Sequence, residues 1–131
     1  MIEERVAAAI RRPVRSLRRI QTRGYAQAFH AIAELDDGSM AFVKAGAEDV
    51  TSEFLRQEIR FYEAVQGSFM PTLLGYDAGT PPLLVIEDLS AARWPPPWDG
   101  GAIDAVRATL GAAWSTPAPC WVPPITEDRE K

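Results

Sequence analysis

Met40-Ala41-Phe42-Val43-Lys44 is a short apolar run that ends in a lysine. Lys44 is one of only two lysines in the chain, and the other is the last residue, Lys131. All other basic residues are arginines, which differ from lysine in shape, hydration and hydrogen bonding. The lysine at the end of this predicted strand therefore indicates a chemical role for its amino group.

Residues 50–66 have the spacing of an amphipathic helix. Its apolar side chains fall on about half of the helix surface: Val50, Phe54, Leu55, Ile59, Phe61, Tyr62 and Val65. Glu58 lies near the middle of this face. A carboxylate on a buried face is costly unless a cation meets it, so we expect an ion pair between Lys44 and Glu58. A structural ion pair without any ligand is the simpler alternative.

The composition predicts one small intracellular domain. The chain has 131 residues, of which 47% are hydrophobic, enough for a modest core. Its single cysteine, Cys120, excludes a disulfide framework and makes the cytoplasm the default location. Cys120 and the sole histidine, His30, provide fewer Cys and His ligands than a structural zinc site needs. Neither a membrane-spanning stretch nor a signal peptide is recognisable, so we expect no membrane partner.

The charge is unevenly distributed. Residues 1–23 carry a net charge of +5, although the whole chain has a formal charge of −4. A basic segment can bind nucleic acid or an anionic membrane surface. No aromatic residue is interleaved among its arginines up to position 23 to stack on bases, so we favour arginines on solvated faces.

The order of predicted elements indicates an α+β fold. We expect a five-stranded antiparallel sheet with one packed helix, an N-terminal helix, and a C-terminal helix after a hinge. Asp36-Asp37-Gly38 is typical of a tight turn, Gly67 is the expected end of the second helix, and 83–86 is the expected central strand. The predicted helices are 2–12, 50–66 and 102–116, and the predicted strands are 16–22, 29–35, 39–45, 72–76 and 83–86.

The order of predicted elements and the local composition divide the chain into four segments. Residues 1–90 form one lobe, and 91–101 form a connector rich in proline, glycine and tryptophan. Residues 102–116 restore helical spacing, and the proline-rich segment 117–131 is expected to be a flexible tail.

Residues 23–88 resemble the amino-terminal lobe of the aminoglycoside phosphotransferase and choline kinase superfamily, a branch of the protein-kinase-like fold. The similarity extends more loosely over residues 14–119. The motifs that carry it are Gly24 in a phosphate-covering bend, Val43-Lys44 at the end of the third strand, 54–62 as the glutamate-bearing helix, 84–89 as a hinge strand, and 109–117 as a later helix end.

The resemblance implies a nucleotide site and an activity. Family members transfer the γ-phosphate of ATP to an alcohol group of a small molecule, with Mg²⁺. By this resemblance, Lys44 would grip the α- and β-phosphates while Glu58 holds it in place, and Gly24 would approach the phosphates. The carbonyl of Glu87 and the amide of Leu89 would contact adenine. The alternative for residues 84–89 is an ordinary buried strand followed by acidic residues, with no contact to adenine.

The residues that would complete catalysis are missing from this sequence. The family uses a histidine-x-aspartate motif with asparagine five residues later, and a further aspartate for metals. This chain contains no asparagine, and His30 precedes Lys44. We read Asp88, Asp99, Asp104 and Asp128 as hinge, connector, helix-start and tail residues with no catalytic role.

These departures predict an isolated lobe, as a truncated product, a gene fragment or an excised domain. It should bind nucleotide weakly and catalyse no turnover. The alternative is a non-catalytic binding or regulatory module on a kinase-like scaffold, and binding of nucleic acid ranks last. A lone lobe should also expose apolar surface and allow self-association, near Trp94, Trp98, Trp114 and Trp121.

Overall fold

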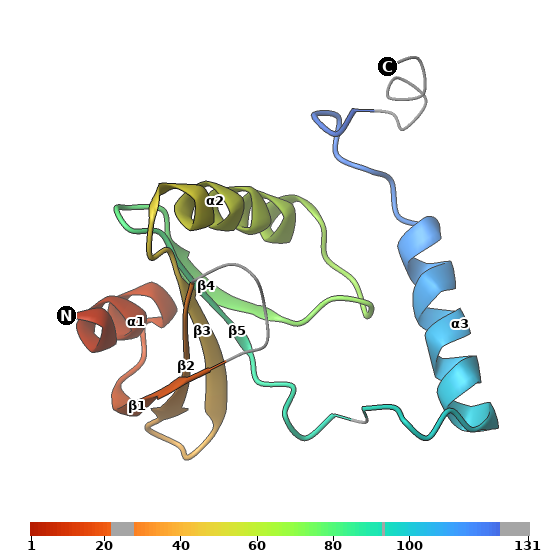
Figure 1. Cartoon of the computed structure of the whole chain (residues 1–131), viewed down its shortest axis with the longest axis horizontal. Helices are drawn as coiled ribbons and strands as arrows, with labels where there is room; N and C mark the ends of the chain where they lie inside the picture. Colours follow the sequence, from red (N-terminus) through yellow and green to blue (C-terminus); the bar gives the residue numbers. More distant parts are fainter. Residues whose placement is uncertain (22–27, 93, 124–131) are drawn as a thin grey trace.

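One antiparallel sheet organises the chain, with the strand order β1-β2-β3-β5-β4 (Figure 1). The computed structural model describes residues 1–21, 28–92 and 94–123, and within them the protein is α+β. The strands are β1 (Val14–Ile20), β2 (Phe29–Leu35), β3 (Met40–Ala45), β4 (Leu73–Asp77) and β5 (Leu83–Glu87), and the helices are α1 (Ile2–Ile10), α2 (Asp49–Ala64) and α3 (Gly100–Trp114). The predicted five-stranded antiparallel sheet is confirmed.

The β2–β3 hairpin is the most regular part of the sheet. Gly38 adopts a φ of 84°, a conformation that suits glycine, and the Leu35 amide donates to the Ser39 carbonyl at 2.8 Å. The Asp37 carboxylate accepts a hydrogen bond from the Ser39 amide at 2.9 Å. This turn sets the register in which His30 lies opposite Lys44.

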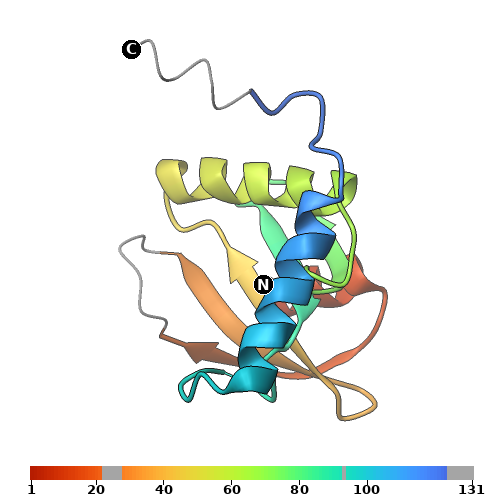
Figure 2. The ribbon, with the colours of Figure 1, turned by 90° about the vertical axis from the view of Figure 1, so that its right-hand side faces the viewer.

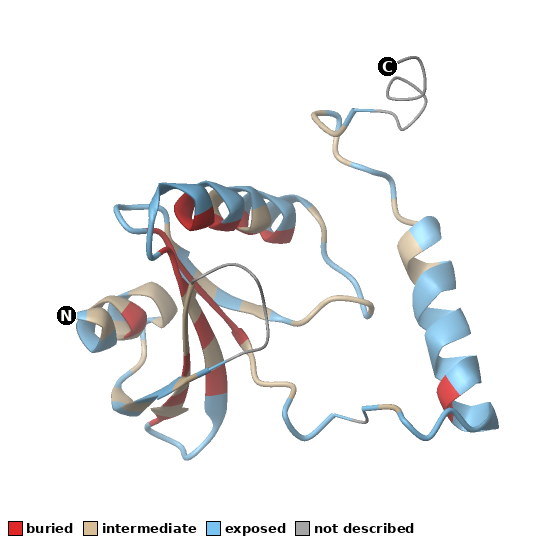
Figure 3. Cartoon of the chain, in the orientation of Figure 1, coloured by how far each residue is buried: buried red, intermediate tan, exposed pale blue. Residues whose placement is uncertain are grey.

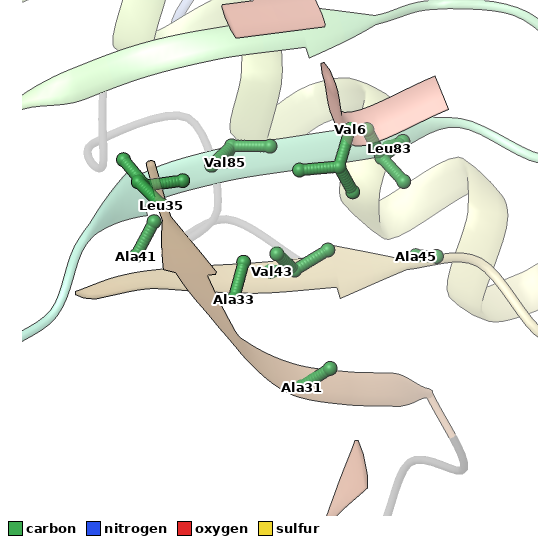
Figure 4. Close-up of a cluster of buried hydrophobic side chains, with 9 residues drawn as sticks. All are labelled: Val6, Ala31, Ala33, Leu35, Ala41, Val43, Ala45, Leu83 and Val85. Carbon is green, nitrogen blue, oxygen red and sulfur yellow. The ribbon is translucent and has the colours of Figure 1, made fainter. Parts of the chain in front are cut away.

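The alternation of side chains along the strands divides the core in two. Small and branched residues at odd positions of β2, β3 and β5 pack with Val6 of α1 (Figure 4). On the other face, Leu84 and Ile86 pack with Leu55, Ile59 and Tyr62 of α2. β5 lies between β3 and β4 and is buried on both faces, which confirms the predicted central strand.

Helix α1 lies very close to the edge strand β4. A Cβ atom at Gly75 would be 2.7 Å from the carbonyl carbon of Ala9, so only glycine permits this approach without a shift of the helix. Arg5 of α1 reinforces the contact by an ion pair with Asp77 at 2.9 Å. The first strand begins at Val14, two residues earlier than predicted, directly after α1 and Pro13.

Helix α2 begins where the sequence indicates but presents a narrower buried face. The Thr51 hydroxyl accepts from the Glu48 amide at 3.0 Å in a capping box. Val50, Phe54 and Phe61 are exposed, so their predicted placement on the buried face was wrong. The sheet covers only a stripe one residue wide per turn, and these three side chains lie outside it.

The predicted stop of α2 at Gly67 was also wrong. The helix ends at Ala64, because Val65 adopts an extended conformation with φ −126° and ψ 123°. Gly67 lies beyond this point, against the ring of Phe69.

Helix α3 stands apart from the sheet (Figure 1) and shows mostly exposed residues (Figure 3). It begins at Gly100, two residues before the predicted start, because the Asp99 carboxylate caps it by accepting from the Ala102 amide at 2.8 Å. Ile103, Val106 and Leu110 are exposed on it. Among the described residues, no helix has the length and apolar character needed to cross a membrane.

The segment after α3 passes in front of one end of α2 in the turned view (Figure 2). Trp121 packs edge-on against Phe61, with ring centroids 4.6 Å apart, and Arg60 lies 4.1 Å from the Trp121 ring centroid. Trp121 is therefore half-buried. The expected exposure is confirmed for Trp94, Trp98 and Trp114 but not for Trp121.

Candidate functional site

Lys44 and Glu58 meet on the α2 side of the sheet. Lys44 lies on β3, on the same face as Phe42, and its Nζ donates to Glu58 Oε1 at 2.6 Å. The two side chains are 27% and 34% exposed, so water reaches both. The predicted ion pair is confirmed as a contact. It joins α2 to β3 and leaves the amino group of Lys44 accessible for a further interaction.

A cavity of about 500 Å³ opens beside this pair. The sheet supplies an apolar lining through Ile20, Ile32, Phe42 and Ile86. Lys44 supplies a positive charge. The remaining lining residues come from the C-terminal half of α2, the approach to β4, and the segment after β5: Tyr62, Pro71, Glu87, Asp88, Leu89, Ser90 and Trp94. A largely apolar cavity of this size with few polar groups is typical of a small-molecule site.

The segment after β5 is held by its own side chains. The Glu87 carboxylate accepts from the Thr72 amide at 2.8 Å. The Asp88 carboxylate accepts from the Ser90 amide at 3.1 Å and from the Ser90 hydroxyl at 2.5 Å. Both acidic groups therefore fix the chain where β5 ends. The Leu89 amide donates to no group among the described residues, so this N–H is available to a ligand.

His30 modifies the charge around Lys44. Its ring stacks on Phe42, with centroids 5.7 Å apart, and it lies opposite Lys44 in the β2–β3 register. Burial lowers the pKa of His30, the positive charge of Lys44 lowers it further, and Glu58 acts in the opposite direction. His30 is thus neutral at pH 7 and adds no second positive charge beside the cavity.

The cavity brings together three of the five predicted site residues. Lys44, Glu87 and Leu89 line it, and Glu58 reaches it through Lys44. Gly24 lies outside the described residues. Of the aspartates set aside from the sequence, Asp88 lines the cavity, Asp99 caps α3, Asp104 is exposed on that helix, and Asp128 lies outside the described residues.

Nine of the twelve lining residues were not among the site residues predicted from the sequence. Ile32 and Phe42 could have been found, because strand alternation places Phe42 on the Lys44 face and the hairpin pairs it with Ile32. Ile20 of the edge strand and Trp94 of the connector carry no such signal, since neither the strand's irregular register nor the connector's path follows from local patterns.

A magnesium site is not formed by the described residues. No group of three or more histidine, cysteine, aspartate or glutamate side chains lies together in them. Glu87 and Asp88 are the carboxylates of the cavity lining, and they already accept hydrogen bonds from the Thr72 and Ser90 amides respectively. The donor set therefore does not fit the Mg²⁺ that the resemblance implies, and no step is assigned to the metal.

Comparisons of this chain with protein-family models, with curated proteins and with solved structures found no match.

Proposed function

We propose that this chain is a nucleotide-binding lobe of the kind found in small-molecule phosphotransferases related to aminoglycoside phosphotransferases and choline kinases. One observation carries the proposal: a single cavity joins the paired Lys44 to the hinge residues Glu87 and Leu89. In a kinase-like lobe the lysine binds the phosphates and the hinge binds the base. This cavity therefore has a group suited to each end of a nucleotide.

The fold supports this assignment. A five-stranded antiparallel sheet carries a lysine on its third strand, and the helix packed on that face carries the glutamate that binds it. The ion pair leaves Lys44 accessible to water, as a group that must contact phosphate requires. We propose a cytoplasmic location, because the sequence has a single cysteine, Cys120, and so no disulfide framework.

We propose that the chain binds ATP weakly and does not transfer phosphate alone. Transfer to an alcohol needs a base-like aspartate and metal-binding side chains. The described residues bring together no cluster of such groups at the cavity. A non-catalytic binding or regulatory module is the second candidate. The lack of clustered carboxylates among the described residues supports this module as well as it supports an inactive nucleotide-binding lobe.

We propose no nucleic-acid or membrane partner for the arginine-rich front, because acidic side chains lie beside two of its arginines. Arg12 pairs with Asp36 and Asp37 at 2.9 Å each, and Arg15 lies 3.8 Å from Glu34. These acidic neighbours offset the positive charge that would attract phosphates.

Calorimetric titration with ATP tests the proposal. We expect weak binding by the wild-type chain, lost on Lys44→Met and weakened on Glu58→Gln, because the phosphate grip needs the lysine in place. Arg107→Met is the matched control, since it removes one positive charge from the exposed face of α3. A melting temperature that does not change when ATP is added, together with tight association with a partner protein, would favour the non-catalytic module.

A coupled assay of ATP hydrolysis tests the second half of the proposal. We expect no turnover with or without Mg²⁺. Sustained Mg²⁺-dependent turnover that disappears on Lys44→Ala would contradict the assignment of an inactive lobe.

A further inference from the structure

Trp94 reaches the cavity from outside the lobe. It belongs to the connector after β5, yet its ring lines the same cavity as Lys44 and the hinge. Its Nε1–H donates to the Leu89 carbonyl at 2.9 Å. Because the indole nitrogen is tied to the hinge, the ring is held beside the strand that contributes Ile86 and Glu87.

The turn that carries Trp94 is itself built by hydrogen bonds. The Ala92 amide also donates to the Leu89 carbonyl, at 3.0 Å. Ser90 is fixed to the Asp88 carboxylate through its amide and its hydroxyl. The chain thus turns back immediately after the hinge. These bonds hold residues 88–92, and the indole nitrogen ties Trp94 to the same segment at Leu89.

The exposure of Trp94 is unusual for a ring anchored in this way. Trp94 is 66% exposed, although tryptophan is among the residues that bury the most apolar area. The rest of the apolar cavity lining comes mainly from strand residues, including Ile32 and Phe42. A flat ligand between the connector and the sheet would therefore cover apolar surface on both.

We propose that Trp94 stacks on the purine base of a bound nucleotide and makes the site selective for nucleotides over simple polyphosphates. The inference rests on the proposed function. A purine has two apolar faces for Trp94 and the sheet, and a polar edge for the Leu89 amide. Stacking on an aromatic ring strengthens base binding without reading the base's identity, so adenine and guanine nucleotides bind alike through this contact.

Three variants separate stacking from a structural role. Trp94→Leu removes the ring but keeps apolar bulk, and Trp94→Phe keeps a ring but removes the Nε1–H donor. Trp98→Leu is the matched control, because Trp98 is an exposed tryptophan of the same connector that does not line the cavity. Each is titrated with ATP, adenosine and inorganic tripolyphosphate, by calorimetry and by tryptophan fluorescence.

The expected result is a graded loss that depends on the base. Trp94→Leu should weaken ATP and adenosine binding about tenfold, Trp94→Phe should weaken it less, and Trp98→Leu should leave it unchanged. Tripolyphosphate binding should be the same in all of them. Wild-type fluorescence should be quenched by adenosine, and this quenching should disappear in Trp94→Phe.

Two other outcomes distinguish this inference from the proposed function. ATP binding that needs Lys44 but is equal in wild type and Trp94→Leu overturns the stacking role and leaves the nucleotide site intact. Adenosine binding that needs Trp94, with no added affinity for ATP and no effect of Lys44→Met, retains the stacking role and overturns the phosphate grip. No binding of ATP or adenosine to the wild type overturns both.

Discussion

The Lys44–Glu58 contact is short, but both side chains keep about a third of their surface in water. An ion pair this accessible contributes at most about 1 kcal/mol to stability, because solvent screens the charges. Removing either partner should therefore leave the lobe folded. The residues are better suited to positioning a charge than to holding the fold together, and Lys44→Met is a usable probe of ligand binding.

His30 makes the stability of the lobe depend on pH. Its pKa is lowered in the folded state by burial and by Lys44, so the unfolded chain takes up a proton first as the pH falls. The stabilising contribution is complete above the unfolded pKa of about 6.5 and is lost below it. Wild-type protein should lose more unfolding free energy between pH 7.5 and 5.5 than His30→Gln, measured by urea denaturation.

The carboxylates do not interfere with that comparison. The pKa values of Asp37 and Asp77 are lowered by hydrogen bonds, first from Ser39 and Gly79 respectively, so their stabilising contributions vanish only at more acidic pH. Equal losses for wild type and His30→Gln over the same interval would contradict the role assigned to His30.

Among the elements, α1 depends on a single glycine. Gly75→Ala would push a methyl group into the backbone carbonyl of Ala9, so α1 must move away from β4 or the strand must bend. We expect a loss of about 1–3 kcal/mol in unfolding free energy, measured by chemical denaturation. Gly111→Ala is the control, because an added Cβ there meets no heavy atom within 4 Å. Equal stability of the two variants would contradict the close packing.

Local patterns in the sequence predicted the elements better than their contacts. The β2–β3 hairpin and the start of α2 follow from Gly38 and from the Glu48–Thr51 capping box, which act within a few residues. The exposure of Phe54 depends on how much of the helix the sheet covers. The periodicity of the helix sequence alone does not show how wide a face the sheet covers.

The residues of the candidate site also differ in this way: some could be predicted from local patterns, and others depend on tertiary contacts. Lys44 and Glu58 could be paired because each was anomalous in its own element: a lysine ending an apolar strand in a chain whose other basic residues before Lys131 are arginines, and an acid on an apolar helix face. Trp94 joins them only through a hydrogen bond to Leu89 after the chain has turned back. Likewise, Trp121 is covered because the segment after α3 returns to Phe61 and Arg60. Such long-range contacts depend on tertiary structure.

At the scale of the whole molecule, helix α3 is the exception to the packing of the lobe. A helix of 15 residues is marginally stable in water without packing against another surface. Its apolar residues Ile103, Val106 and Leu110 are all exposed, and Trp114 extends the same side. Its charged side chains are limited to Asp104 and Arg107, which leaves little repulsion between copies.

We therefore expect α3 to cause self-association. The wild-type chain should bind a hydrophobic dye and show a mass that rises with concentration in sedimentation, because apolar surface on α3 is available to other copies. Replacing Ile103, Val106 and Leu110 together by glutamine should reduce both signals. The control is Asp104→Asn with Arg107→Gln, which changes the same helix but keeps its apolar face. A wild-type monomer at every concentration, with no dye binding, would show that this face is covered in solution.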